Sequence, residues 1–156
     1  NYRNQLRPRP PPSRLAQQWK TPTHRRKNSY FYLYIMNHHQ FTQTITTNLP
    51  DFKSQPLKPK HLLFSQGDPA TNFFLILSGS LKLTHLNPDG DQNIIEIINQ
   101  NELIGTESFD PNSTYKISAQ AITQVQSLSL PRLQFLQLLN TDPTLYLYLI
   151  KQFRHK

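Results

Sequence analysis

Seven acidic side chains and two histidines in the central part of the chain are the groups that could carry acid–base or metal chemistry. The acids are Asp68, Asp89, Asp91, Glu96, Glu102, Glu107 and Asp110, and the histidines are His61 and His85. An enzyme needs such groups to converge with a nucleophile or a bound nucleotide. Most of these acids lie in turn-like sequence, with no His/Asp/Ser set and no nucleotide-binding loop. The sequence therefore predicts that the chain is not an enzyme.

Metal and other cofactor sites are not predicted either. The chain has no cysteine, which excludes disulfides, thiolate metal sites and cysteine-bound iron–sulfur clusters. His61 and His85 are better explained as surface residues of strands than as axial ligands of a haem. We therefore expect no cofactor.

Four glycines in turn-like contexts divide the middle of the chain into short apolar segments. They are Gly67, Gly79, Gly90 and Gly105, separated by 12, 11 and 15 residues. The β-rich segments between and after them are Phe73–Leu77, Leu81–Leu86, Ile94–Ile98, Ile117–Ile122 and Val125–Leu130. Short strands with turn signals at this spacing predict an all-β sandwich or barrel. Asp89-Gly90 favours a hairpin turn, because glycine tolerates a positive φ.

Helical patterns flank the predicted strands. Phe41, Ile45 and Leu49 are spaced for one apolar helix face. After Pro131 the segment Arg132–Leu139 reads as a short helix. Asp142-Pro143 then combines a capping acid with a first-turn proline, which predicts a second helix start.

The net charge of +8 lies entirely in residues 1–35. That segment contains eight of the seventeen basic residues, none of the nine acids and five of the thirteen prolines, so residues 36–156 are neutral. Such a composition cannot bury enough apolar surface to fold alone, which predicts a disordered basic tail. Three interpretations are open: a transit peptide, a basic arm, or sequence outside the natural protein, since the only methionine is Met36. No stretch is apolar enough to predict a membrane span.

The segment 63–83 carries a family resemblance and reads LFSQGDPATNFFLILSGSLKL. It resembles the cyclic-nucleotide-binding domain family, and most closely the sensory half of Crp/Fnr transcription regulators. The similarity continues through Asp89-Gly90 and Leu103-Ile104-Gly105 to Leu128-Ser129-Leu130-Pro131. The resemblance implies a mainly β fold, an antiparallel double-stranded β-helix or jelly-roll barrel with flanking helices. It also implies that residues 36–156 are a sensory domain ending in the start of a dimerisation helix.

The resemblance also implies where a ligand would bind. Family members that bind a cyclic nucleotide hold its phosphate in a cassette that a Gly-Glu opens and an Arg closes. The cassette-equivalent residues here are Gly105, Thr106, Glu107, Ser108, Thr114, Tyr115 and Lys116. Thr106 stands at the glutamate position, with Glu107 one residue late. Tyr115 stands at the arginine position, and Lys116 beside it is expected on a solvated face, so cyclic AMP is not the expected effector.

Three functions are open. The chain is an effector-sensing domain of a Crp/Fnr-type regulator, a cyclic-nucleotide module with a degenerate cassette, or a structural or interaction barrel without a ligand. Residues 115–123 are similar to the nitrogen-control regulators of cyanobacteria and plastids, which implies a 2-oxoglutarate-like anion as an alternative effector to a cyclic nucleotide. The relatives continue into a helix-turn-helix, whereas nothing follows Lys156, so we expect no specific DNA binding.

Two expectations concern assembly and location. Leu145, Leu149 and Phe153 repeat at helical spacing and predict weak homodimerisation. The resemblance implies a location in the cytoplasm or the plastid stroma, without a membrane partner.

The tail analysis yields a testable prediction. A chain beginning at Met36 should melt within about 3 °C of the full chain, because residues 1–35 lack the apolar surface to stabilise the fold. Circular dichroism melting of both chains measures this difference. A melting temperature lower by about 10 °C or more would show that the tail stabilises the fold.

Overall fold

In the computed structural model, residues 36–49, 51–52 and 54–154 are described, and they contain two four-stranded antiparallel sheets. The strands are β1 Ser54–Leu57, β2 Leu62–Phe64, β3 Asn72–Ser78, β4 Leu81–Leu86, β5 Gln92–Ile98, β6 Leu103–Ile104, β7 Ser118–Ala121 and β8 Val125–Pro131. Sheet A has the order β1-β8-β3-β6 and sheet B the order β2-β7-β4-β5. The expectations for residues 1–35 lie outside the described residues.

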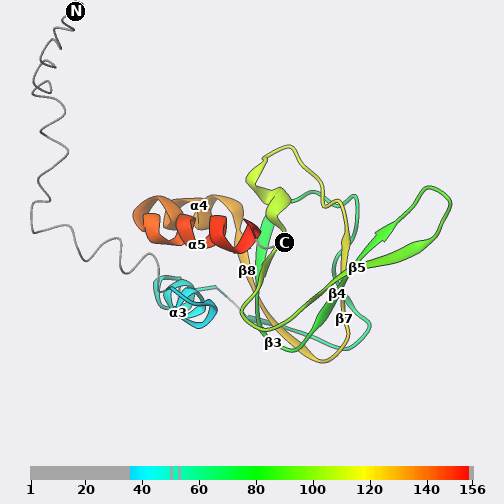
Figure 1. The fold of residues 1–156 in the computed structure, drawn as a ribbon, viewed down its shortest axis with the longest axis horizontal. Helices are drawn as coiled ribbons and strands as arrows, with labels where there is room; N and C mark the ends of the chain where they lie inside the picture. The colour runs from blue at the N-terminus through cyan, green and yellow to red at the C-terminus, as the bar shows by residue number, and fades with distance from the viewer. Residues whose placement is uncertain (1–35, 50, 53, 155–156) are drawn as a thin grey trace, which may run out of the picture. The chain divides into compact units, whose positions relative to one another are not determined.

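Helices α3 (His38–Asn48), α4 (Arg132–Thr141) and α5 (Pro143–Arg154) lie on one side of the sheets, and the β4–β5 hairpin extends away on the other (Figure 1). The short 3₁₀ helix η1 (Thr106–Phe109) follows β6. This arrangement confirms the predicted mainly β, antiparallel fold with flanking helices.

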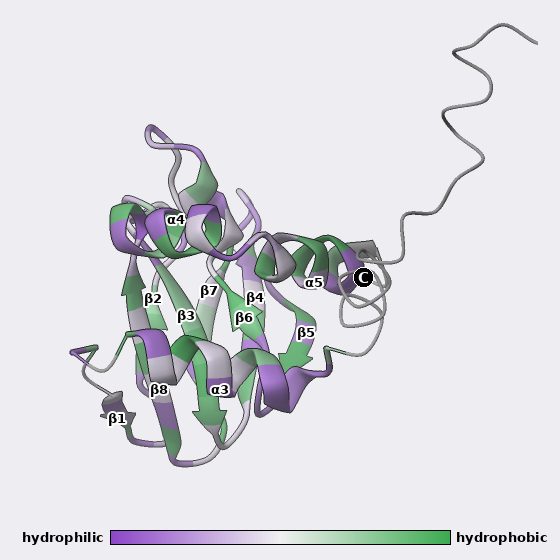
Figure 2. Cartoon of the chain, turned by 90° about the vertical axis from the view of Figure 1, so that its left-hand side faces the viewer, coloured by the Kyte–Doolittle hydropathy of each residue, from purple (hydrophilic) through white to green (hydrophobic). Residues whose placement is uncertain are grey.

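Strand β3 separates two apolar cores, because its successive side chains point to opposite faces of sheet A. Phe73 and Leu75 pack with the helices in one cluster, whereas Phe74 and Ile76 pack between the sheets in the other. All four are buried, and strand β3 is coloured as hydrophobic in Figure 2. The strand therefore connects the interior of the barrel to the helical layer.

The five predicted strands are present, with bounds shifted by at most two residues at an end. Strands β1, β2 and β6 were not predicted. They have four, three and two residues, which is too short for a periodic signal. β1 also contains Pro56, which is tolerated because β1 is an edge strand of sheet A.

The helical layer confirms the predicted helix patterns. Asn37 caps α3 by accepting a hydrogen bond from the Gln40 amide at 2.9 Å, and the Gln40 side chain accepts one from Asn37 in return. Phe41 and Ile45 are fully buried against sheet A and the other helices. The predicted start of α5 is also confirmed, since Asp142 accepts a hydrogen bond from the Thr144 amide.

The packing of helix α5 shows that two of the three residues predicted for dimerisation are unavailable to a partner. Leu145 and Leu149 are buried in the core of their own chain and are not available to a partner. Phe153, the third residue of the predicted set, stays exposed, and Leu147 and Ile150 are the other exposed large apolar side chains of α5. Sequence spacing alone could not distinguish the buried residues from the exposed ones, since both sets occur at helical intervals.

The Gln66 side chain fastens the turn end of the β4–β5 hairpin. Its amide nitrogen donates to the carbonyl of Leu86 at 3.2 Å, and its oxygen accepts from the Leu86 amide at 2.8 Å. A bulge between Leu83 and Thr84 interrupts the pairing of β4 with β5. Beyond Leu86 the turn closes with Gly90, whose φ is +93° as Asp89-Gly90 predicted.

Gly79 and Gly67 offer a matched pair of substitutions. Both have a left-handed φ, but a Cβ at Gly79 would lie 2.2 Å from the Gln124 carbonyl oxygen, whereas one at Gly67 would meet nothing within 4 Å. We expect Gly67→Ala to cost about 1–2 kcal/mol from backbone conformation alone. Gly79→Ala should cost about 4 kcal/mol, because the chain must also move. Urea unfolding of the two variants measures this, and equal losses would contradict the prediction.

Tyr148 gives the fold a dependence on alkaline pH. Burial, and then the charge of Glu102, raise the pKa of Tyr148 to about 12, and its hydroxyl lies 2.6 Å from Nδ1 of His38. An unfolded tyrosine titrates near pH ~10, so the stabilisation is fully present below that pH and is lost as pH rises through the folded pKa. The melting temperature should fall more steeply above about pH 10 in the wild type than in Tyr148→Phe. Equal slopes would contradict this assignment.

Candidate functional site

The cassette-equivalent residues lie in one loop that connects β6 to β7. Gly105 ends β6 in a left-handed conformation, with φ +81°, and precedes η1. A Cβ at this position would lie 2.8 Å from the Asn72 carbonyl oxygen. Position 105 therefore requires glycine for two reasons: its φ is left-handed, and β3 approaches so closely that a Cβ would not fit.

Tyr115 is the buried centre of the site. Its side chain is 4% exposed and its ring stacks on Phe64, with centroids 4.1 Å apart. The hydroxyl donates to the Asn72 carbonyl oxygen at 2.7 Å and accepts from the Asn72 amide at 3.3 Å. Ser108, also buried, donates to the same carbonyl oxygen at 2.7 Å. The main chain of Asn72 thus holds the tyrosine and η1 together.

The Tyr115 hydroxyl is kept protonated by its surroundings. Burial raises its pKa, hydrogen bonds with Ser108 and Asn72 partly offset this rise, and the charges of Glu107 and Asp68 add to it. A neutral phenol is a hydrogen-bond donor, as the contact with Asn72 requires. It cannot replace the positive charge that a buried phosphate needs.

The remaining cassette-equivalent residues line the outside of the loop. Oε1 of Glu107 accepts from the Lys116 amide at 3.1 Å, while the Lys116 side chain is exposed, as predicted. Thr106 and Thr114 are half-buried, and Thr114 bridges to Pro69. The structure therefore brings Gly105, Ser108 and Tyr115 together and leaves Lys116 on the surface.

Sequence reasoning missed three participants in the site. Asn72 acts through its main chain, so no side-chain pattern could reveal it. Phe64 stacks on the tyrosine from β2, a strand that was not predicted. Asp68 accepts from the Tyr115 amide through its carbonyl at 2.9 Å, which ties the Gly67 turn to the loop.

His61 and His85 each make one hydrogen-bond contact within the described part of the chain. No group of three or more potential ligands is found there. Nδ1 of His85 lies 2.9 Å from the Asn87 side-chain oxygen, and Nδ1 of His61 lies 3.3 Å from the Pro59 carbonyl.

A hollow of about 280 Å³ lies away from the cassette, between the end of α3 and α4. Leu49, Phe52, Gln137 and Leu138 contribute to its lining. None of its lining residues belongs to the β6–β7 loop, and it is open to solvent. It does not enlarge the space beside Tyr115.

Residues 54–142 match the family model of the cyclic nucleotide-binding domain. The chain belongs to the cyclic nucleotide-binding domain family. It is homologous to the Crp/Fnr-type transcription regulators, as the resemblance implied. It is 34% identical over 73 residues to the CRP-like cAMP-activated global transcriptional regulator of Mycobacterium tuberculosis, and 34% identical over 79 residues to the transcriptional activator Anr of Pseudomonas aeruginosa. These matches cover 46% and 51% of this chain but 32% of each relative, so the chain spans about a third of their length.

Solved structures of this cyclic nucleotide-binding family show the same jelly-roll fold. A transcriptional regulator from Thermotoga maritima has a TM-score of 0.65 at 25% identity, covering 71% of this chain and 87% of that one. The sensor domain of the regulator DNR from Pseudomonas aeruginosa has a TM-score of 0.62 at 23% identity, covering 81% and 87%. The part of the chain that matches is the sensory domain of these regulators. Such domains are typically not enzymes.

The relatives named above are all bacterial, and they give no support to a plastid location. Among the described residues, no helix is both long and apolar enough to cross a membrane.

Proposed function

We propose that residues 36–156 act as the effector-sensing domain of a Crp/Fnr-type regulator whose effector is not a cyclic nucleotide. The observation that carries this proposal is Tyr115. It stands where nucleotide-binding members of the family place an arginine, and it is stacked and hydrogen-bonded inside the site. The sequence has no arginine between Arg26 and Arg132.

The energetics favour the tyrosine over a cyclic phosphate. A phosphate entering the loop would have to displace the Tyr115 ring from Phe64 and break both contacts with Asn72. It would find no guanidinium, and Lys116 is a point charge at the surface. A missing partner for a buried charge costs about 2–5 kcal/mol, which corresponds to a loss of roughly 30-fold to several-thousand-fold in affinity.

A 2-oxoglutarate-like anion is the second candidate effector. The Lys116 ammonium favours it, because it forms no ion pair with a described carboxylate. The carboxylates of Glu107 and Asp68, which act on Tyr115, oppose it. Binding experiments should therefore test 2-oxoglutarate as well as the cyclic nucleotides.

The contacts of β3 suggest how occupancy of the site would reach the helices. Asn72 holds Tyr115, and the next residue, Phe73, points to the opposite face of sheet A. The Phe73 ring contacts Phe135 of α4 at 4.8 Å and Phe109 of η1 at 4.7 Å between centroids. Displacing Tyr115 would remove one of the two hydroxyl donors to the Asn72 carbonyl oxygen and would shift this aromatic contact. The proposal therefore requires a second packed arrangement of that contact when the effector is bound.

We further propose that α5 mediates homodimerisation through Leu147, Ile150 and Phe153. These side chains are 44%, 61% and 36% exposed, whereas Leu145 and Leu149 pack in the chain's own core. Crp-like regulators are dimeric, which supports this assignment. Twelve helical residues bury little surface, so the dimer of this chain should be weak.

Calorimetric titration with cyclic AMP tests the effector proposal. The wild type should bind more weakly than about 100 μM, because the arginine is missing. Tyr115→Arg should bind at least about tenfold more tightly, whereas the matched control Tyr115→Phe should show no gain. Thermal melting confirms that each variant is folded. Sub-micromolar binding of cyclic AMP by the wild type would contradict the proposal.

A further inference from the structure

The outer face of sheet B is not covered by any described helix. Helices α3, α4 and α5 all pack on sheet A, and Figure 1 shows sheet B on the opposite side. In an antiparallel sheet with one solvated face, the outward-facing side chains are commonly polar. This face departs from that pattern.

One row of side chains crosses all four strands of sheet B. In the strand register Leu62 lies opposite Gln120, Gln120 opposite Lys82, and Lys82 opposite Ile97. Their chain neighbours Leu81, Leu83, Ala119, Ala121 and Ile98 are buried between the sheets. The row therefore points outward. Leu62 and Ile97 are 48% and 45% exposed, and Ile122 beside the row is 46% exposed.

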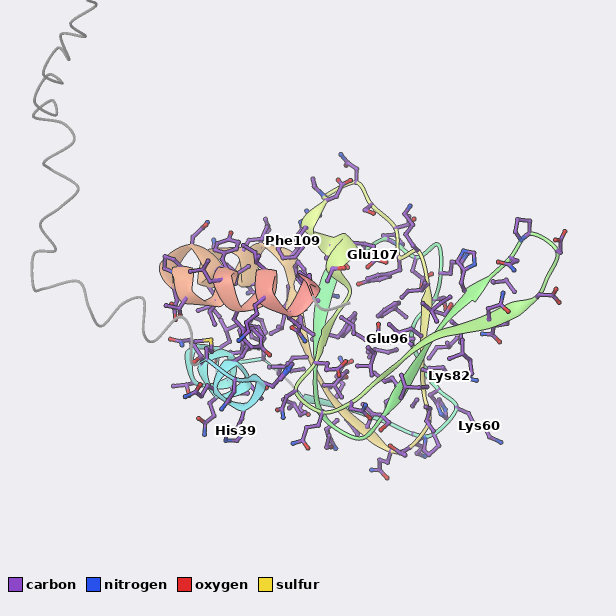
Figure 3. The ribbon with its side chains drawn as sticks, in the orientation of Figure 1. His39, Lys60, Lys82, Glu96, Glu107 and Phe109 are labelled. Carbon is purple, nitrogen blue, oxygen red and sulfur yellow. The ribbon has the colours of Figure 1, made fainter. Side chains whose placement is uncertain are left out.

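The charge on this outer face is purely basic. Figure 3 shows Lys60 and Lys82 pointing away from the barrel on the same side. The side-chain amide of Gln120 donates to the Lys60 carbonyl at 2.8 Å, which places Lys60 beside the row. Neither ammonium forms an ion pair with a carboxylate of the described residues. Glu96 is the only acid in the strands of sheet B, and it lies opposite Leu83, on the inner face.

We infer that the outer face of sheet B, formed by Lys60, Leu62, Lys82, Ile97 and Ile122, docks an acidic protein segment that carries apolar side chains between its carboxylates. Charge complementarity supports such a partner, since neither lysine is paired with a carboxylate of the described residues. Apolar side chains flanking the charges match the mixed character of protein interfaces. A nucleic acid is less well suited, because the face has no arginine and its aliphatic groups would meet phosphate.

The partner is expected to use the face of sheet B and not its free edge. Strands β2 and β5 are the two edge strands of sheet B; β2 has only three residues, and the pairing of β5 with β4 is already interrupted by the bulge at Leu83. The inward-pointing Glu96 is a further feature that protects edge strands from pairing. Side chains of the face are therefore the binding groups.

Fluorescence anisotropy with labelled peptides tests this inference on the full chain. The probe is a peptide of Glu and Leu in equal numbers, compared with one in which Ser replaces every Leu. The second peptide measures charge-only binding, including that of the basic residues in 1–35. We expect the Glu/Leu peptide to bind about tenfold more tightly at about 0.15 M salt. Lys82→Glu and Ile97→Ser should each weaken it about fivefold or more.

Matched control variants lie on the helical side of the molecule. Lys151→Glu and Leu133→Ser change an exposed charge and an exposed apolar residue there, and each should alter binding less than about twofold. Melting curves exclude loss of folding as the cause of a change. If the peptide fails to bind, or if Lys82→Glu and Ile97→Ser behave as the controls do, the inference is wrong. The inference is also wrong if duplex DNA or phosphatidylserine vesicles bind the chain, and if Lys82→Glu weakens that binding as much as it weakens peptide binding while Ile97→Ser leaves it unchanged.

Discussion

The carbonyl oxygen of Asn72 is the acceptor on which the loop between β6 and β7 depends. Two hydroxyl groups from distant positions, those of Tyr115 and Ser108, donate to it at 2.7 Å each. Gly105 must approach the same atom so closely that no side chain fits. Both lone pairs of the oxygen are thus used, and the 3₁₀ turn, the tyrosine and strand β3 have a common fixed point. Removing any one donor leaves a buried acceptor less well satisfied, which costs more than the bond itself contributes.

The same arrangement explains why a cyclic nucleotide-binding fold can persist without the arginine. In a phosphate site the buried anion would organise the loop from within. Here a neutral phenol with an aromatic stack on Phe64 provides the internal contact instead. The contacts that hold this loop in the structure come from the chain itself. Whatever effector acts on this domain must compete with an ordered side chain and not with an empty, hydrated space.

The sequence was sufficient for the fold and for only part of the site. Glycine turns and alternating strands such as Leu81–Leu86 were visible because each obeys a local rule of backbone geometry. The substitution of arginine by Tyr115 was also visible, but what the tyrosine does was not. Its acceptor is a main-chain atom 43 residues away, and its stacking partner lies on a three-residue strand. On α5 the apolar residues occur at helical spacing on more than one side, so the sequence could not tell which of them are buried. Their packing in the core of the chain identifies Leu145 and Leu149 as the buried ones.

The Gln66 clamp on Leu86 divides the β4–β5 hairpin into two parts that should open independently. Below the clamp, Leu81 and Leu83 are anchored in the core, so their amides can exchange with solvent only when the barrel itself unfolds. Leu86 has its amide and carbonyl held by a side chain from another turn, and it marks the end of that cooperative unit. Past it, residues 87–91 form a solvated turn whose opening costs little. We therefore expect the free energy of local opening to rise within a few residues, from the solvated tip to the buried base of the hairpin.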